Sequence, residues 1–401
     1  MAGGDPVAGL ASRTRSDFAI AREWAFLDNA YIPPLPRAVK EAALEWYERR
    51  ASEQIDVFDL LRTVSEVRQS FSRFINASPE EIGFLYTTSE AENIVTRALE
   101  LVPGDNIVTD DLAYPHTLVL GRQLEKTAGI EFRVVRHNRG TVTADDFAAL
   151  VDRRTRLITI PWVSNINALR HPVAALADLA HTYGAWLLVD AIQIVGTEPL
   201  DVRAAGIDVL CTGTYKWLMA GWGIAALYVR REILDRLPPD RYGWQTALAS
   251  VGSPQREDPR RTAAKFEYAS PSFDQYPILQ AALCYKLGLG LDAVHRHSQA
   301  WLGRARRYLE GAGFELLTPP GNVAPALTFW VGASREETDG RFRAANVRVG
   351  FSTGSRTSET YGADPSVCRV RVSPAHYNDW TDLERFLGVA CTLPRYRTEA
   401  Q

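Results

Sequence analysis

The sequence predicts an α/β protein with a larger domain built on a mostly parallel seven-stranded sheet and a smaller α+β domain after it. Short runs rich in β-branched and apolar residues alternate with stretches whose apolar residues recur at helical spacing. This alternation is typical of a parallel sheet covered on both faces. The pattern changes after about residue 238, and 401 residues suffice for two domains.

Seven runs have the length and composition of buried strands. They are residues 82–88, 106–110, 132–137, 156–163, 186–192, 208–214 and 224–229. Between two of them, residues 171–184 carry apolar side chains at helical spacing and close on Gly184, as a helix would.

The remaining chain predicts a different organisation. Residues 238–261 are rich in proline, glycine and charge and predict a long exposed loop, and residues 277–312 predict a long helical region. Short strands and a last helix follow over 314–391. We therefore predict an N-terminal segment, 1–25, that packs on the small domain, a large domain, 26–285, and a small C-terminal domain, 286–401.

Composition and charge exclude several classes of protein. The net charge of −3 is spread over mixed signs, with no basic tract for nucleic acid and no apolar run long enough for a membrane. The four cysteines lie far apart without a C-x-x-C pair, which favours buried thiols over disulfides or a zinc site. His295 and His297 lie two apart on a predicted helix and face different ways, so no metal is expected. We expect a cytoplasmic protein.

Lys216 stands out in "TGTYKWLMAGWG", residues 212–223. It is one of five lysines in a chain with forty arginines, and no acidic residue lies within seven positions of it. A desolvated lysine can become a nucleophilic amine, which arginine cannot. The alternative is a lysine whose stem packs on Trp217 while its ammonium reaches water.

Two further motifs end predicted strands, where ligands gather in open α/β sheets. In "YTTSEAEN", Thr88 and Ser89 could hold a phosphate at a helix N-terminus, or Ser89 could form a capping box with Glu92. Asp190 ends the run "LLVDAIQ" and is either a charged site residue or a helix N-cap.

Together these motifs indicate pyridoxal 5′-phosphate. This cofactor needs a lysine for a Schiff base, a carboxylate for its ring nitrogen, a phosphate cradle and a flat side chain to stack on its ring. Lys216, Asp190 and the turn at Thr88 and Ser89 supply the first three, and Tyr114 in "DDLAYPHT" is suited to the stack.

The chain resembles the class V aminotransferase and cysteine desulfurase family of fold-type I pyridoxal-phosphate enzymes over nearly its whole length. The matching pieces are "FLDNAYIPPLP", "YTTSEAEN", "LAYPH", "VSNINA", "VDAIQ", "TYKWLMAGWGIAALYV", "FEYASPSF" and "VRVSPAHYN". The resemblance implies that Asn165 and Gln193 contact the phenolic oxygen of the cofactor and that Tyr215 reaches its phosphate. Tyr114 stands where many relatives stack a histidine.

The resemblance also implies a homodimer with shared active sites. Ser270 matches a residue that relatives send to the neighbouring cofactor's phosphate. Arg371 matches the arginine that binds the α-carboxylate of an amino-acid substrate, and a guanidinium suits a carboxylate because it can bind both oxygens.

Two departures separate the chain from the desulfurases. The stretch "FSTGSRTSETYG", 351–362, lacks the loop cysteine, and Tyr215 replaces the histidine that precedes their Schiff-base lysine. Cys368 lies later, where packing is the expected role. Both departures lean toward the isopenicillin-epimerase-like and kynureninase-like branches.

We therefore expect a pyridoxal-phosphate lyase or aminotransferase that acts on an α-amino acid or an amino-acid conjugate. The expected chemistry is C–S cleavage by β-elimination, or deamination or decarboxylation, and the arginine-rich composition suggests specialised metabolism. The alternatives are an aminotransferase or epimerase of a small amino acid, and a non-catalytic binding module. Tyr242, Trp244 and Trp330 are candidates for a substrate pocket or for the core.

Overall fold

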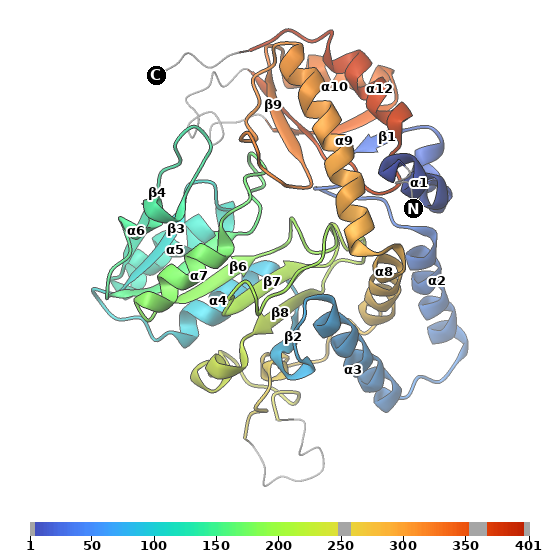
Figure 1. The fold of residues 1–401 in the computed structure, drawn as a ribbon. Helices are drawn as coiled ribbons and strands as arrows, with labels where there is room; N and C mark the ends of the chain where they lie inside the picture. Colours follow the sequence, from blue (N-terminus) through green and yellow to red (C-terminus); the bar gives the residue numbers. More distant parts are fainter. Residues whose placement is uncertain (1–4, 248–257, 353–366, 397–401) are drawn as a thin grey trace.

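The structure is a computed structural model that describes residues 5–247, 258–352 and 367–396, and it contains two sheets (Figure 1). The larger sheet has the strand order β2-β8-β7-β6-β5-β3-β4. Its strands are β2 (Ile82–Leu85), β3 (Asn106–Asp110), β4 (Glu131–Val135), β5 (Thr155–Pro161), β6 (Trp186–Asp190), β7 (Val209–Gly213) and β8 (Ala225–Val229). In this sheet β8 alone runs opposite to the other six strands, so the predicted seven-stranded, mostly parallel sheet is confirmed.

Both faces of the larger sheet are covered by helices, as the apolar runs predict. On β6, Leu187 and Val189 join the apolar cluster with α3 (Val57–Phe74), α6 (Ala144–Ala148), α7 (Val173–Thr182) and α8 (Gln275–Leu289). Trp186 and Leu188 point the other way and pack with α4 (Thr88–Ala98) and α5 (Pro115–Ala128). The period of two along the strand therefore assigns each side chain to one face.

The smaller sheet has the order β1-β10-β11-β9 and lies beside the larger unit (Figure 1). Its strands are β1 (Ala25–Leu27), β9 (Leu327–Val331), β10 (Val347–Ser352) and β11 (Cys368–Val372). Helices α9 (Leu291–Gly311), α10 (Arg335–Ala344) and α12 (Trp380–Ala390) form a second core with it. The predicted helical region divides into α8 and α9 at Gly290, whose φ of +78° favours glycine.

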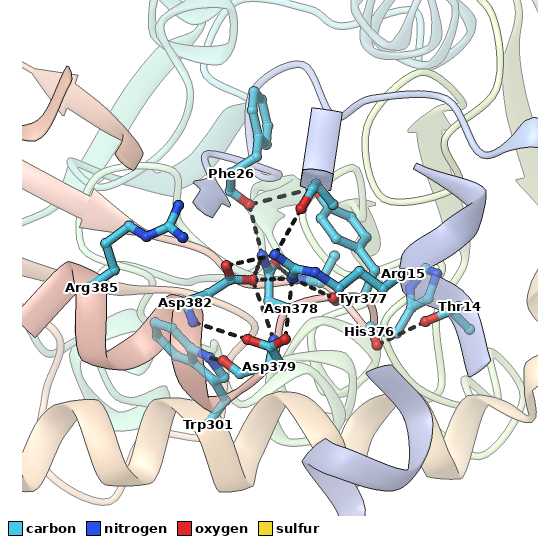
Figure 2. Close-up of polar contacts among 12 residues, drawn as sticks. Thr14, Arg15, Phe26, Trp301, His376, Tyr377, Asn378, Asp379, Asp382 and Arg385 are labelled. Atoms are coloured by element: carbon cyan, nitrogen blue, oxygen red, sulfur yellow. Dashed lines mark hydrogen bonds and ion pairs between the residues drawn. The ribbon is translucent and has the colours of Figure 1, made fainter. Parts of the chain in front are cut away.

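The N-terminal segment lies against this smaller unit. Helix α1 (Pro6–Thr14) packs on α9, and Arg15 follows it. Figure 2 shows Arg15 directed at the buried carboxylate of Asp382, with Nη1 and Oδ2 2.7 Å apart. Asn378 donates to the same oxygen at 2.9 Å and to the carbonyl of Phe26 at 3.2 Å. Strand β1, Ala25–Leu27, pairs with β10 of this sheet. The exact domain boundaries stay a prediction.

The remaining elements connect these units. Helix α2 (Arg37–Ser52) packs on α8. Short 3₁₀ helices are η1 (Arg15–Asp17), η2 (Ala19–Arg22), η3 (Pro79–Glu81), η4 (Arg231–Arg236) and η6 (Ala263–Phe266). Part of the loop predicted at 238–261, namely 248–257, lies outside the described residues, as does most of 351–362.

The cysteines are free thiols, but the expectation that all are buried is wrong. Cys211 and Cys368 are buried, and Cys368 packs in the core of the small sheet. Cys284 and Cys391 are exposed because they lie on the outer side of α8 and at the end of α12.

Large aromatic residues divide in the same way. Trp330 is core, at 1% exposure, whereas Tyr242 and Trp244 are exposed. Among the described residues no helix combines the length and apolar character that crossing a bilayer requires.

Candidate active site

A cavity of 330 Å³ opens at the carboxyl ends of β6 and β7, beside the N-termini of α4 and α5. This is the position where ligands bind in open α/β sheets. Six of the ten predicted site residues line it: Thr88, Ser89, Tyr114, Asp190, Tyr215 and Lys216. The sheet topology therefore brings together residues that lie up to 128 positions apart in the sequence.

The phosphate-binding turn begins α4, although its cap differs from the one considered in the sequence. The N-cap is Thr87, whose side chain accepts from the backbone N–H of Glu90 at 3.2 Å. Glu90 in turn accepts from the N–H of Tyr86 at 2.9 Å. The Ser89–Glu92 capping box is therefore wrong. Within the described chain the hydroxyls of Thr88 and Ser89 form no hydrogen bond, which leaves them free for an anion at the helix N-terminus.

Lys216 lies in a tight turn between β7 and β8. Thr214 fixes the turn by donating to the carbonyls of Gly221, at 3.0 Å, and Ile224, at 3.1 Å. Met219 donates to the Lys216 carbonyl at 2.7 Å and has a φ of +59°, a conformation that costs about 1 kcal/mol for a residue with a side chain. The turn directs the chain so that Lys216, at 8% exposure, faces the cavity.

Burial changes the chemistry of Lys216. Desolvation, with help from the positive charge of Arg371, lowers the pKa of its amine to about 8, against the opposing charges of Asp190 and Asp28. The alternative of a lysine whose ammonium reaches water is therefore wrong. Near neutral pH a substantial fraction of the amine is neutral and nucleophilic.

Asp190 ends β6 at the wall of the cavity. Its Oδ1 accepts from the backbone N–H of Ile192 at 2.9 Å, in a turn rather than at the start of a helix. Burial raises its pKa, while the Ile192 N–H and the charge of Lys216 act in the opposite direction. Hence Asp190 is not a helix cap, and its second oxygen remains available to a ring nitrogen.

Aromatic side chains line the cavity beyond the predicted ones. Tyr215 stacks on Trp222 with ring centroids 3.7 Å apart and an interplanar angle of 14°. Trp222 and the half-buried His116 also line the cavity. Both were missed in the sequence, although His116 lies two residues after Tyr114 and Trp222 stands between the glycines of "AGWG".

Asn165 and Gln193 do not line this cavity in the described chain, and their contact with the cofactor stays a prediction. The buried Oδ1 of Asn165 has no hydrogen-bond partner, which is the condition of a group that awaits a ligand. Gln193 is engaged at both ends of its amide, with Trp217 Nε1 at 3.2 Å and the Ala30 carbonyl at 3.3 Å.

Arg371 lies on β11 and is not among the residues that line the cavity. Its charge lowers the pKa of Lys216, so the two side chains lie near one another. Its Nη2 pairs with Asp28 Oδ1 at 3.1 Å, whereas its buried Nε has no partner. Gly350 leaves room for this pair, since a Cβ there would lie 2.6 Å from Asp28 Oδ1. Asp28 was missed in the sequence because its partner lies 343 residues away.

In the described chain, Ser270 contacts the cavity wall only through its backbone. It is exposed and does not line the cavity of its own chain. Its carbonyl accepts from the hydroxyl of Tyr86 at 2.8 Å. A role at a neighbouring chain's site stays a prediction.

The residues present fit pyridoxal phosphate. Free hydroxyls at a helix N-terminus suit the phosphate, a buried carboxylate suits the ring nitrogen, and a partly neutral lysine suits the aldehyde. A Cβ at Gly213 would lie 2.8 Å from Ile192 Cδ1 and 3.4 Å from Thr88 Oγ1, so this glycine keeps the cavity open between ring site and phosphate site.

Comparison with known proteins identifies similar sequences. A family model described as Aminotransferase class-V matches residues 25–386. Cysteine desulfurases from Klebsiella pneumoniae (strain 342) and Escherichia coli (strain SE11) are each 30% identical, and the alignments cover 94% of this chain and 96% of each relative.

Solved structures share the fold. A cysteine desulfurase from Thermococcus onnurineus NA1 is 25% identical, with a TM-score of 0.86 over 98% of this chain and 99% of that chain. The cystine C–S lyase C-DES, in complex with its product cysteine persulfide, is 18% identical, with a TM-score of 0.81 over 92% and 98%. At that identity the likeness shows the fold alone.

Proposed function

Because the chain belongs to the class V aminotransferase family and is a pyridoxal-phosphate-dependent enzyme, we propose that it binds a sulfur-containing α-amino acid or its conjugate and cleaves the Cβ–S bond by elimination. The observation that carries this proposal is the electrostatic interaction of Arg371 with Lys216, whose amine lines the cavity. It provides a cation for a free α-carboxylate beside an amine that can move a proton at Cα.

Arg371 is the proposed substrate anchor. Its Nη2 holds Asp28 at 3.1 Å, and its unpartnered Nε can donate to an incoming carboxylate. Asp28 is only 4% exposed, and its contact with Nη2 orients the guanidinium, whose charge in turn opposes the rise that burial causes in the pKa of Asp28.

Lys216 and Asp190 have different roles in the proposed elimination. When bound, the cofactor supplies an electron sink for the charge that develops at Cα. Asp190 holds a proton on its ring nitrogen, and Lys216, with a pKa near 8, takes the proton from Cα as a general base.

The sequence supports elimination over persulfide transfer. Residues 351–362 contain no cysteine that could attack a substrate sulfur. Cys368 is fully buried in β11, and burial raises the pKa of its thiol to about 11, which opposes a nucleophilic role. C–S chemistry is supported by the relatives, which are cysteine desulfurases. The arginine-rich composition agrees with a role in specialised metabolism.

The products test this proposal. The enzyme is incubated separately with cysteine, cystine and S-alkylcysteines, with Lys216→Ala as the inactive control. Elimination breaks the Cα–H and Cβ–S bonds and yields pyruvate, ammonia and the sulfur leaving group, whereas desulfuration yields alanine. Pyruvate from the conjugates supports the proposal. Rapid formation of alanine and sulfane sulfur from cysteine alone contradicts it, and a D-amino acid or an oxo acid that retains sulfur would indicate the epimerase or aminotransferase alternative.

We also propose that the enzyme is a homodimer whose two sites each use both chains. Three large aromatic side chains that line the cavity are also exposed, which favours a covered surface. They are Tyr86, Tyr114 and Trp222. The exposed Ser270 would then reach the partner's phosphate.

Mixed dimers test the shared site. Lys216→Ala and Ser270→Asp are each expected to be inactive, because one lacks the amine and the other sets a negative charge at the partner's phosphate. Co-expressed with different tags, they should form heterodimers that regain part of the activity at one site. A monomer by light scattering, or no recovery in purified heterodimers, would contradict the shared site.

A further inference from the structure

Glu92 is a buried carboxyl that takes no part in the proposed elimination. It lies on α4, is 4% exposed, and lines the cavity together with Asp190. It follows Thr88 by four positions, so both side chains lie on one side of the helix. Behind it, a pocket of 10 Å³ between α4, α5 and the sheet has room for about one water molecule.

The sheet brings Glu92 and Asp190 to the same narrow space. Side chains of Trp186 and Leu188 point to the α4 side, and the alternation along β6 places Asp190 there too. On β7, Cys211 pairs in register with Asp190 and points to that face. Burial raises the pKa of the Cys211 thiol, and the charges of Asp190 and Glu92 add to this effect. The Cys211 thiol is therefore close enough to both carboxyls for their charges to affect its pKa.

The two carboxyls have unequal partners. Asp190 accepts from the Ile192 N–H and faces the amine of Lys216, and both favour its charged form. The carboxyl of Glu92 has one hydrogen bond in the described chain, which its Oε1 accepts from the Thr117 hydroxyl at 2.9 Å. From α5, the half-buried His116 also lines the cavity.

The same inequality sets the order in which the carboxyls ionise. Burial, reinforced by the negative charge of Asp190, raises the pKa of Glu92 to about 8, while the Thr117 hydroxyl acts in the opposite direction. Two buried carboxyls in one site do not both ionise readily, and the one with fewer donors keeps the proton.

We propose that Glu92 is a positioning residue that acts on the cofactor through Asp190, by holding the proton of the pair so that the negative charge stays on Asp190. Its bond to Thr117 also ties α4 to α5, where the Thr117 N–H donates to the carbonyl of the ring-stacking Tyr114 at 3.1 Å. This inference rests on the bound cofactor and not on which bond of the substrate is cleaved.

Infrared spectroscopy of the cofactor-free protein tests where the proton lies. The infrared difference spectrum between wild type and Glu92→Gln should contain the carbonyl band of a protonated carboxyl at pH 7. As the pH is raised, this band should disappear with a midpoint near pH 8. In Asp190→Asn the midpoint should fall because a neighbouring charge is lost, and in Thr117→Val it should rise because a donor is lost. A Glu92 carboxyl that is already ionised at pH 6 would overturn the proposal, and the Asp190→Asn and Thr117→Val shifts test it even if Glu92→Gln does not fold.

The holoenzyme tests the effect on the cofactor. With pyridoxal phosphate labelled with ¹⁵N in the ring, the ¹⁵N resonance of the wild type should move at alkaline pH as Glu92 ionises. In Glu92→Gln this movement should be absent, while the resonance at pH 7 stays at its wild-type position. Glu125→Gln, the same change at a half-buried position of α5 outside the cavity, is the control and should follow the wild type. Identical pH courses in wild type and Glu92→Gln would overturn the proposal, whatever the reaction proves to be.

Discussion

The amine of Lys216 should titrate far below the ordinary range of lysine. Its pKa falls from 10.5 to about 8, which corresponds to about 3 kcal/mol in favour of the neutral form. At pH 7.5 about a quarter of the amines would be neutral, against about 0.1% for an unperturbed lysine. Because a neutral amine is the nucleophile, labelling of Lys216 should rise with pH and level off above 8.

Competitive labelling of the cofactor-free protein measures this titration. A trace amine reagent is added between pH 6 and 11, with a free amine of known pKa as internal standard, and the peptide that contains Lys216 is quantified by mass spectrometry. Asp190→Asn should lower the midpoint, because the Asp190 charge raises the pKa of the amine. Asp178→Asn removes an equal charge from the exposed side of α7 and should leave the midpoint unchanged. A midpoint above 10 in the wild type would refute the conclusion that burial depresses the pKa of Lys216.

Three further outcomes are expected. Arg371→Ala should mainly raise KM, and the resulting fall in kcat/KM should correspond to a loss on the order of 2–5 kcal/mol. Arg348→Ala, on the neighbouring strand, is the control. An unchanged KM in steady-state kinetics would exclude Arg371 as the anchor. Gly213→Ala should weaken cofactor binding at least tenfold in equilibrium dialysis, because its Cβ would lie 2.8 Å from Ile192 Cδ1, whereas Gly303→Ala on α9, with its nearest atom at 3.7 Å, should bind normally. Arg15→Ala should lower the free energy of unfolding, measured by urea denaturation, by about 2 kcal/mol, because it leaves the buried Asp382 without its cation. A loss no larger than that of Arg13→Ala, at an exposed position, would count against this role.

The sequence predicts the larger sheet well because the signal for its strands is local. Buried parallel strands are short apolar runs, and each of the seven runs overlaps a strand of the sheet. Parallel topology then brings the strand ends together, which is why Asp190 and Lys216 share a cavity.

What the sequence could not provide are contacts between distant elements. Glu92 resembles a capping residue in "TSEAEN", and only the packing of α4 on β6 and β7 reveals a buried carboxyl. Asp28 has no local sign of its pairing with Arg371 across the small sheet. The exposure of Cys284 depends on which side of α8 faces the core, and the sequence does not decide this because apolar residues occur all round that helix.

Identification of the lysine that binds the cofactor tests the central claim most directly. The holoenzyme is reduced with borohydride, digested, and its five lysines are examined by mass spectrometry for an added pyridoxyl group. Lys286 is a demanding internal control, since burial lowers the pKa of its amine to about 7, yet it does not line the cavity. The label is expected on Lys216 alone and should be lost in Lys216→Ala. A label on Lys286, or one that persists in Lys216→Ala, would contradict the assignment of Lys216 as the cofactor-binding residue.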